Sequence, residues 1–300
     1  MDQTAGRVVV VGDALIDEIR TPAGSDDHVG GAGLNVAVGL ARLGVPTTLL
    51  ASVGDDADGA AVRAHLAEHG VELVATVNPL GTGRAVSERV DGEPSYSFTE
   101  AAVARGLDFS PEQVAAIAVA PLVAVSSYPF DDAWLTERLL QHVGAEPPRL
   151  VVDPNPRPGF LRDVDDFRAG FARAAAVSLL VKIGSDDAEL VAGTSLEGWQ
   201  EALLASGAGA VLATRGSDGA DLQLAGGPVL HRDVAVSAGE VVDTMGAGDA
   251  TFASIVASLL AGTSGPGSTD WAAALTDAMA VAAATVRAPG ALLRRPGDEG

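Results

Sequence analysis

Residues 241–252 read Val241-Val242-Asp243-Thr244-Met245-Gly246-Ala247-Gly248-Asp249-Ala250-Thr251-Phe252: an apolar pair, a glycine-rich loop and the start of an apolar helix. Gly246 and Gly248 carry no side chain that would keep a phosphate at a distance. The first turn of a helix leaves its amide N–H groups without intrahelical partners, and the helix dipole adds positive potential there. The stretch therefore predicts an anion site whose donors are the amides of Gly246, Ala247 and Gly248.

Asp249 stands beside this predicted anion site. A negative charge is unfavourable there unless the carboxylate takes up a proton during turnover, which is what a general base on an attacking hydroxyl does. The alternative is that the glycines only form a turn and Asp249 caps the helix. No Gly-x-x-x-x-Gly precedes Lys182, and no Gly-x-Gly-x-x-Gly occurs, so neither a Walker P-loop nor a dinucleotide-binding loop is indicated.

Upstream of this stretch, strands alternate with helices. Val8–Val11 is a β-branched run that ends at Gly12, and Gly30-Gly31-Ala32-Gly33 opens a helical pattern over residues 34–43. Further strands are expected at 47–53, 71–77, 122–126, 150–153, 177–181 and 210–214, an antiparallel pair at 220–224 and 229–233, and helices at 57–69, 247–261 and 271–287. This alternation predicts one α/β domain over residues 1–300, with a parallel sheet covered on both faces.

One segment breaks the alternation. Residues 82–98 contain two runs of alternating polar and apolar residues around Asp91-Gly92, which is typical of an antiparallel hairpin. We expect this hairpin to lie apart from the main sheet.

Composition narrows the class of protein. The 300 residues include no cysteine, which excludes disulfides, thiol nucleophiles and Cys-ligated zinc. The formal net charge of −21 repels nucleic acid and anionic lipid, and it also repels ATP unless backbone amides, Arg and Mg²⁺ make the site locally favourable. No apolar run is long enough to span a membrane, and the first residues lack the pattern of a signal peptide. We therefore expect a cytoplasmic protein with no nucleic-acid or membrane partner.

Two long motifs give the sequence a family resemblance. Asp243 to Phe252 resembles the C-terminal signature of the ribokinase-like (pfkB-type) carbohydrate kinases. Gly30-Gly31-Ala32-Gly33-Leu34-Asn35-Val36-Ala37, about 210 residues earlier, resembles their N-terminal signature. The resemblance covers essentially the whole chain. It implies a three-layer α/β/α Rossmann-like domain with a small β-sheet lid, here about residues 13–30 and 82–100.

The resemblance also implies roles for individual residues. The sugar would be bound by Asp17, Gly31 and Asn35, with Asp249 as the base. Asp153-Pro154-Asn155-Pro156-Arg157 resembles a segment of fructokinase-like and ketodeoxygluconate-kinase-like members, which makes Arg157 a candidate contact for a phosphate or a sugar acid. Taken alone, Asp17 reads as a solvated loop acid, Asn35 as a helix cap and Arg157 as a solvated residue of a proline turn. The nucleotide contacts implied are Lys182, Thr214, Gly216, Gly219 and Thr244.

Metal ligands are implied less directly. Asp186 and Glu189 stand where many members have an Asn-x-x-Glu segment tied to Mg²⁺, and an i, i+3 acid pair on one helix face could hold a hydrated ion. An exposed helix start explains the same pair. Some members also need a monovalent cation such as K⁺, to which Asp243 and the carbonyl of Met245 could contribute, although Arg294 stands where a small polar ligand is expected.

The sequence thus predicts an ATP- and Mg²⁺-dependent kinase of a fructose-like ketose or a related sugar acid. A nucleoside kinase of the same family, or a non-catalytic sugar or nucleotide sensor on the same fold, are the alternatives. Aromatic residues make up only 4% of the chain, which leaves little material for stacking a base. The resemblance also suggests a homodimer formed through the lid.

Overall fold

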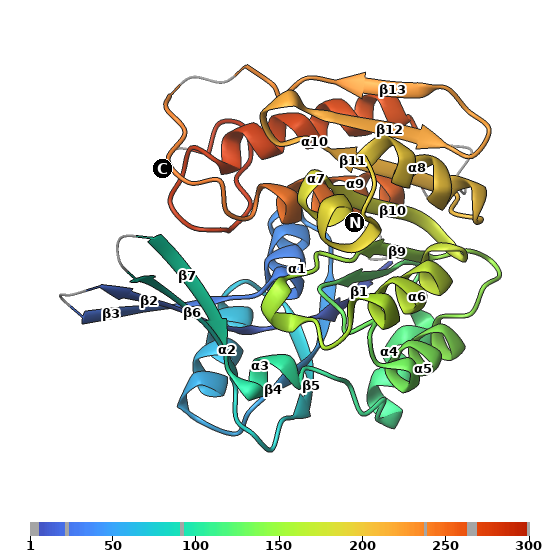
Figure 1. Cartoon of the computed structure of the whole chain (residues 1–300). Helices are drawn as coiled ribbons and strands as arrows, with labels where there is room; N and C mark the ends of the chain where they lie inside the picture. Colours follow the sequence, from blue (N-terminus) through green and yellow to red (C-terminus); the bar gives the residue numbers. More distant parts are fainter. Residues whose placement is uncertain (1–5, 22–23, 91–92, 237–238, 263–268, 299–300) are drawn as a thin grey trace, which may run out of the picture.

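The computed structural model describes residues 6–21, 24–90, 93–236, 239–262 and 269–298. Within these ranges the strands form two sheets, one of nine strands and one of four (Figure 1). The turn predicted at Asp91-Gly92 lies outside the described residues.

The large sheet has the order β13-β12-β11-β10-β9-β8-β1-β4-β5. Its strands are β1 (Val8–Gly12), β4 (Thr47–Val53), β5 (Glu72–Val77), β8 (Val123–Ser126), β9 (Leu150–Asp153), β10 (Ser178–Gly184), β11 (Ala210–Thr214), β12 (Ala220–Leu224) and β13 (Val229–Arg232). In this order, the seven strands β11, β10, β9, β8, β1, β4 and β5 are parallel to one another. Strand β12 is antiparallel to both of its neighbours, β11 and β13. The predicted parallel sheet and its antiparallel pair are confirmed.

Helices cover both faces of this sheet (Figure 1). The helices of the described ranges are α1 (Ala32–Arg42), α2 (Ala57–Glu68), α3 (Glu100–Val103), α4 (Pro111–Val119), α5 (Ala133–Val143), α6 (Val164–Ala175), α7 (Ser185–Asp187), α8 (Leu196–Ala205), α9 (Ala247–Ala261) and α10 (Trp271–Thr285). Short turns lie at η1 (Pro158–Phe160) and η3 (Gly216–Asp218), and a π-helical turn lies at η2 (Ala188–Ala192). None of the helices in the described ranges is long and apolar enough to cross a membrane.

The alternation of side chains along the central strands divides the core into two layers. Val8 and Val10 of β1 pack on the face covered by α1, α9 and α10, whereas Val9 and Val11 pack on the face covered by α4, α5, α6 and α8. All four side chains are 0–1% exposed. Fully burying one such side chain stabilises the fold by roughly 1.5–3 kcal/mol. The unbroken apolar run in β1 therefore follows from a sheet that is buried on both sides.

The second sheet, called the small sheet below, has the order β3-β2-β6-β7. Its strands are β2 (Leu15–Thr21), β3 (Gly24–Gly30), β6 (Gly83–Val90) and β7 (Glu93–Phe98). The hairpin predicted at 82–98 is confirmed as β6 and β7, and residues 13–30 supply a second hairpin that pairs with it through parallel strands β2 and β6. Figure 1 shows this sheet projecting beside the large one.

Candidate active site

The candidate site lies at the carboxyl ends of the parallel strands, where α/β folds bind ligands. A cavity of about 400 Å³ opens there. The described residues that line it are Asn155, Arg157, Lys182, Gly184, Ser185, Asp186, Asp187, Thr214, Arg215, Gly216, Thr244, Met245, Gly246, Gly248 and Asp249. A larger neighbouring cavity, of about 530 Å³, is lined by Glu189 and residues 193–197 and includes neither Asp249 nor the start of α9.

The glycine-rich loop of the sequence forms one wall of the 400 Å³ cavity. Gly246 is the N-cap of α9 and has a left-handed φ of 73°. A Cβ at this position would lie 2.0 Å from the carbonyl oxygen of Ala291, so a side chain does not fit. At the start of α9, Gly246 and Gly248 line the cavity, whereas Ala247 is not among the described lining residues and its amide donates to the carbonyl oxygen of Thr244 at 3.5 Å.

Asp249 is buried in the first turn of α9, with 9% of its surface exposed. Its Oδ2 accepts a hydrogen bond of 2.9 Å from Nδ2 of Asn35 on α1. The alternative of a capping role is wrong, because the N-cap position belongs to Gly246 and the Asp249 carboxylate turns to a different helix. Burial raises the pKa of Asp249 to about 7, against the lowering effect of the Asn35 hydrogen bond. A carboxyl group with that pKa can take up a proton near neutral pH.

A buried ammonium group lies next to this loop. Lys182, which was expected to follow a strand, lies inside β10, and its Nζ donates to Oδ2 of Asp153 at 2.8 Å. A Cβ on Gly248 would be only 3.2 Å from Lys182 Nζ, which places the ammonium directly behind the loop. Burial alone would lower the pKa of Lys182, but Asp153 and Asp187 raise it, so the lysine stays charged.

Among the predicted sugar contacts lies a buried aspartate that was not predicted from the sequence. Asp13 is buried after β1, and its Oδ1 accepts from the amide of Gly33 at 2.9 Å. Asp17 lies within β2 rather than in a loop, so its reading as a solvated loop acid is wrong. Burial first, and then the charge of Asp13, raise the pKa of Asp17 to about 6. Gly31 is the N-cap of α1, the helix that carries Asn35.

Some residues that were predicted to contact the nucleotide or Mg²⁺ do not lie together at the 400 Å³ cavity. Gly219 is not among the described residues that line the cavity; it packs on β13, where a Cβ would lie 2.0 Å from the carbonyl oxygen of Arg232. Asp186 and Glu189 lie where α7 passes into the π turn η2, and the two residues between them, Asp187 and Ala188, both keep right-handed helical φ and ψ. Asp186 lines the 400 Å³ cavity, and Glu189 lines the neighbouring one.

Most of the remaining predicted contacts for the nucleotide or a metal ion lie at the cavity. Arg157, Thr214, Gly216 and Thr244 line it. Asp243 lies just outside, and its carboxylate accepts from the amides of Met245 at 2.9 Å and Gly290 at 3.2 Å, so it joins the glycine loop to the turn near the C-terminus. Within the described residues, no group of three or more His, Asp or Glu side chains forms a ready metal site.

Sequence reasoning missed Asp13, Asp153, Asp187 and Arg105. Arg105 is buried, donates from Nε to the carbonyl oxygen of Ser127 at 3.0 Å and lies 4.2 Å above the ring of Phe160. A signal was present for one of the four, Asp153. Asp153 ends the apolar run 150–152, and a lone lysine inside the apolar run 178–183 requires a buried partner, but the pairing depends on the strand order.

Fold and site together define an enzyme that transfers a phosphoryl group to an alcohol, on a ribokinase-like fold. The chain belongs to the pfkB family of carbohydrate kinases, which it matches over residues 5–296. It is 31% identical to a fructokinase of Rhizobium leguminosarum bv. trifolii over 84% of this chain and 79% of that protein. It is 30% identical to a fructokinase of Klebsiella pneumoniae, covering 92% of this chain and 91% of the relative.

A solved structure supports the same assignment. Aminoimidazole riboside kinase from Salmonella enterica, complexed with aminoimidazole riboside and an ATP analog, superposes with a TM-score of 0.75 at 25% identity. The match covers 95% of each chain.

Proposed function

We propose that this chain transfers the γ-phosphoryl group of ATP to a hydroxyl of a fructose-like ketose or a related sugar acid, with Asp249 as the general base. The observation that carries the proposal is the position of Asp249. It is buried at the start of α9, beside the first-turn amides and hydrogen-bonded to Asn35. The two relatives named as fructokinases support the choice of a ketose.

In the proposed reaction, the acceptor hydroxyl lies between Asp249 and the amides of Gly246, Ala247 and Gly248. The hydroxyl proton passes to the Asp249 carboxylate as the oxygen forms its bond to the γ-phosphorus. The bond from that phosphorus to the β,γ-bridging oxygen breaks, and ADP leaves with the electron pair. Asp17, Gly31 and Asn35 orient the sugar, and the first-turn amides hold the charge of the phosphoryl group in transfer.

We place the ATP phosphates along the 400 Å³ cavity, against Thr214, Gly216 and Thr244, with Lys182 and Arg157 as the cations that favour them. Mg²⁺ binds through one or two carboxylates together with phosphate oxygens and water, and Asp186 at the cavity wall fits that requirement better than Glu189. When bound, the ion neutralises phosphate charge. Dependence on K⁺ at Asp243 and Met245 is a further prediction.

The nucleoside alternative rests on the riboside kinase that resembles this chain. Phe98, at the end of β7, pairs with Phe160, and their ring centroids are 4.1 Å apart. Phe160 is only 3% exposed and packs with Leu15 and Ala102, so its ring is already covered. This packing favours a sugar over a nucleoside.

The test of the base combines two measurements. Asp249→Asn should lower kcat by roughly 10²–10⁴-fold with fructose as acceptor, while ATP binding by calorimetry stays within a few-fold of the parent. A panel of hexoses, sugar acids and nucleosides, assayed by ADP release, identifies the acceptor. Undiminished turnover in the variant would remove Asp249 as the base, and turnover with nucleosides alone would establish the alternative.

We also propose that the small sheet is the lid of this site and that the protein is a cytoplasmic homodimer formed through that sheet. Strands β3 and β7 lie at its two edges, where a second copy can approach. Light scattering at the peak of a sizing column distinguishes a dimer from a monomer.

A further inference from the structure

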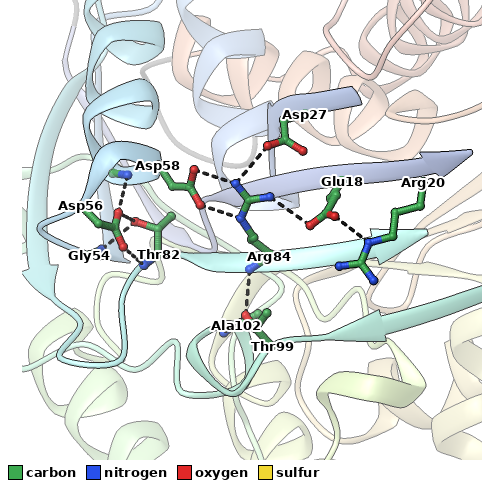
Figure 2. Close-up of polar contacts among 11 residues, drawn as sticks. Glu18, Arg20, Asp27, Gly54, Asp56, Asp58, Thr82, Arg84, Thr99 and Ala102 are labelled. Carbon is green, nitrogen blue, oxygen red and sulfur yellow. Dashed lines mark hydrogen bonds and ion pairs between the residues drawn. The ribbon is translucent and has the colours of Figure 1, made fainter. Parts of the chain in front are cut away.

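A cluster of four charged residues joins the small sheet to the body of the protein. Arg84 in β6 donates from Nε and Nη2 to the two carboxylate oxygens of Asp58 at 2.6 and 2.8 Å. It also donates to Glu18 in β2 and to Asp27 in β3, each at 3.0 Å (Figure 2). Asp58 lies in the first turn of α2, whereas the other three residues belong to the small sheet. The Arg84 cluster, Glu18, Asp27, Asp58 and Arg84, therefore bridges two parts of the fold.

The cluster lies on the opposite face of the small sheet from Asp17. Successive residues of a strand point to opposite faces, so Asp17 and Glu18 of β2 face opposite ways. The pairing of the strands places Glu18 across from Asp27, and Asp17 across from His28. Arg84 therefore lies on the face of the small sheet opposite to Asp17, and it does not reach the sugar that Asp17 is proposed to bind.

A second set of contacts fixes the point where the chain enters β6. Thr82 donates from its amide and its hydroxyl to the carboxylate of Asp56 at 2.7 and 2.6 Å, and the amide of Gly54 donates to the Thr82 hydroxyl at 3.0 Å (Figure 2). Asp56 is the N-cap of α2 and also accepts from the amide of Gly59. The start of α2 is thus the common anchor of both sets.

The balance of charge makes Arg84 different from an ordinary surface ion pair. Three carboxylates meet the Arg84 guanidinium, and of these Glu18 also binds Arg20 at 2.6 Å; the side chains of Glu18 and Arg84 are 12% and 25% exposed, and those of Asp58 and Asp27 are 28% and 45% exposed. Hydrogen bonds to Asp58, then to Asp27 and Glu18, raise the pKa of Arg84 against the effect of burial. Without the guanidinium, the carboxylates of the small sheet would repel Asp58 across the junction. Loss of Arg84 therefore weakens the attachment of the sheet to α2 on this side, while the contacts between Thr82 and Asp56 remain.

We propose that Arg84 is a positioning residue that holds the small sheet against α2, so that Asp17 stays over the acceptor site. This inference rests on the proposed function for its catalytic consequence. Its structural part, the attachment of the sheet, holds for any ligand.

The test compares three variants. Arg84→Ala should raise the KM for the acceptor sugar roughly tenfold while the KM for ATP changes less than about threefold, because none of the described residues that line the 400 Å³ cavity belongs to the small sheet. Arg84→Lys keeps the charge but loses the paired contact with Asp58, and should fall between. The matched control is Arg20→Ala, because Arg20 lies on the same sheet and binds Glu18 at 2.6 Å without reaching α2; its KM values should stay at the parent level.

Amide hydrogen exchange without any ligand separates this inference from the proposed function. Residues 15–21 and 83–90 should exchange faster in Arg84→Ala than in Arg20→Ala, whereas the large sheet should keep its protection. If no acceptor is phosphorylated but this exchange difference appears, the attachment stands and the proposed function fails. Parent-like sugar KM and parent-like exchange in Arg84→Ala would overturn the inference.

Discussion

Asp249 is buried where its negative charge is unfavourable, and this makes the free energy of unfolding depend on pH. In an unfolded chain an aspartate ionises at its ordinary pKa near 4, whereas in the fold the pKa of Asp249 is about 7. Between these values the native state binds more protons than the unfolded state. The contribution of Asp249 to stability is therefore highest below about pH 4 and is lost as the pH rises through 7.

Asp249→Asn tests this directly, because the amide copies the protonated acid at every pH. The variant should gain unfolding free energy relative to the parent as the pH rises from 5 to 8, on the order of 1 kcal/mol or more. Urea denaturation at both values measures the difference, and Asp218→Asn, at an exposed carboxylate outside the site, is the control. A gap that closes toward pH 8 would contradict the buried, uncharged acid.

Lys182 is a second buried charge near the site, and it keeps its charge because Asp153 accepts a hydrogen bond from it. Lys182→Met leaves Asp153 buried without its ammonium partner, and removing one member of a buried pair costs about 3–5 kcal/mol. The double variant Lys182→Met with Asp153→Asn should recover most of that loss, which denaturant unfolding can measure. Equal losses in the single and double variants would mean that the ion pair is not what stabilises this part of the core.

At the scale of elements, helices α1 and α9 hold the two halves of the site together. Asn35 contacts Asp249, and one turn further along each helix Gly39 meets Ala253. A Cβ on Gly39 would lie 3.1 Å from the Cβ of Ala253 and 3.2 Å from Cδ1 of Leu293. The close approach of the helices at Gly39 therefore sets the distance at which Asn35 meets the base.

Gly39→Val should force the helices apart. We expect a loss of roughly 1–3 kcal/mol in unfolding free energy, together with a fall in kcat because the base shifts relative to the acceptor. Adding Ala253→Gly makes room for the new side chain and should restore part of both. A Gly39→Val enzyme with parent kcat would show that the spacing of α1 and α9 does not govern the base.

The helices and strands also show how much of the structure can be predicted from the sequence. The strands of the large sheet, the hairpin at 82–98 and the start of α9 follow from local patterns, because each is encoded within about ten residues. The link between Lys182 and Asp153, and that between Arg84 and Asp58, join residues 29 and 26 positions apart. Such links depend on which strands and helices become neighbours, which no local pattern specifies. The π turn at Ala188–Ala192, which contains Glu189, was likewise not predicted from the helical spacing.

At the scale of the whole molecule, the net charge of −21 opposes the binding of an anionic nucleotide. Groups at the proposed site favour the nucleotide locally: the first-turn amides, Lys182, Arg157 and Arg215 lie around the cavity. Arg215, however, already donates to Glu197 at 2.6 Å and to Asp221 at 2.5 Å, so part of that positive charge is neutralised. The long-range field should therefore remain unfavourable for ATP.

Salt should relieve this repulsion. The screening length shortens from roughly 30 Å at 0.01 M to about 8 Å at 0.15 M, so distant surface carboxylates are screened while Lys182, which is buried close to the proposed phosphate position, is screened much less. We expect the Kd for ATP, measured by calorimetry with fixed Mg²⁺, to fall several-fold over this range, whereas the Kd for uncharged adenosine stays constant. NaCl is the appropriate salt, because KCl would add the predicted K⁺ effect. An ATP affinity that weakens with salt, while adenosine binding does not change, would mean that the local cations outweigh the acidic surface.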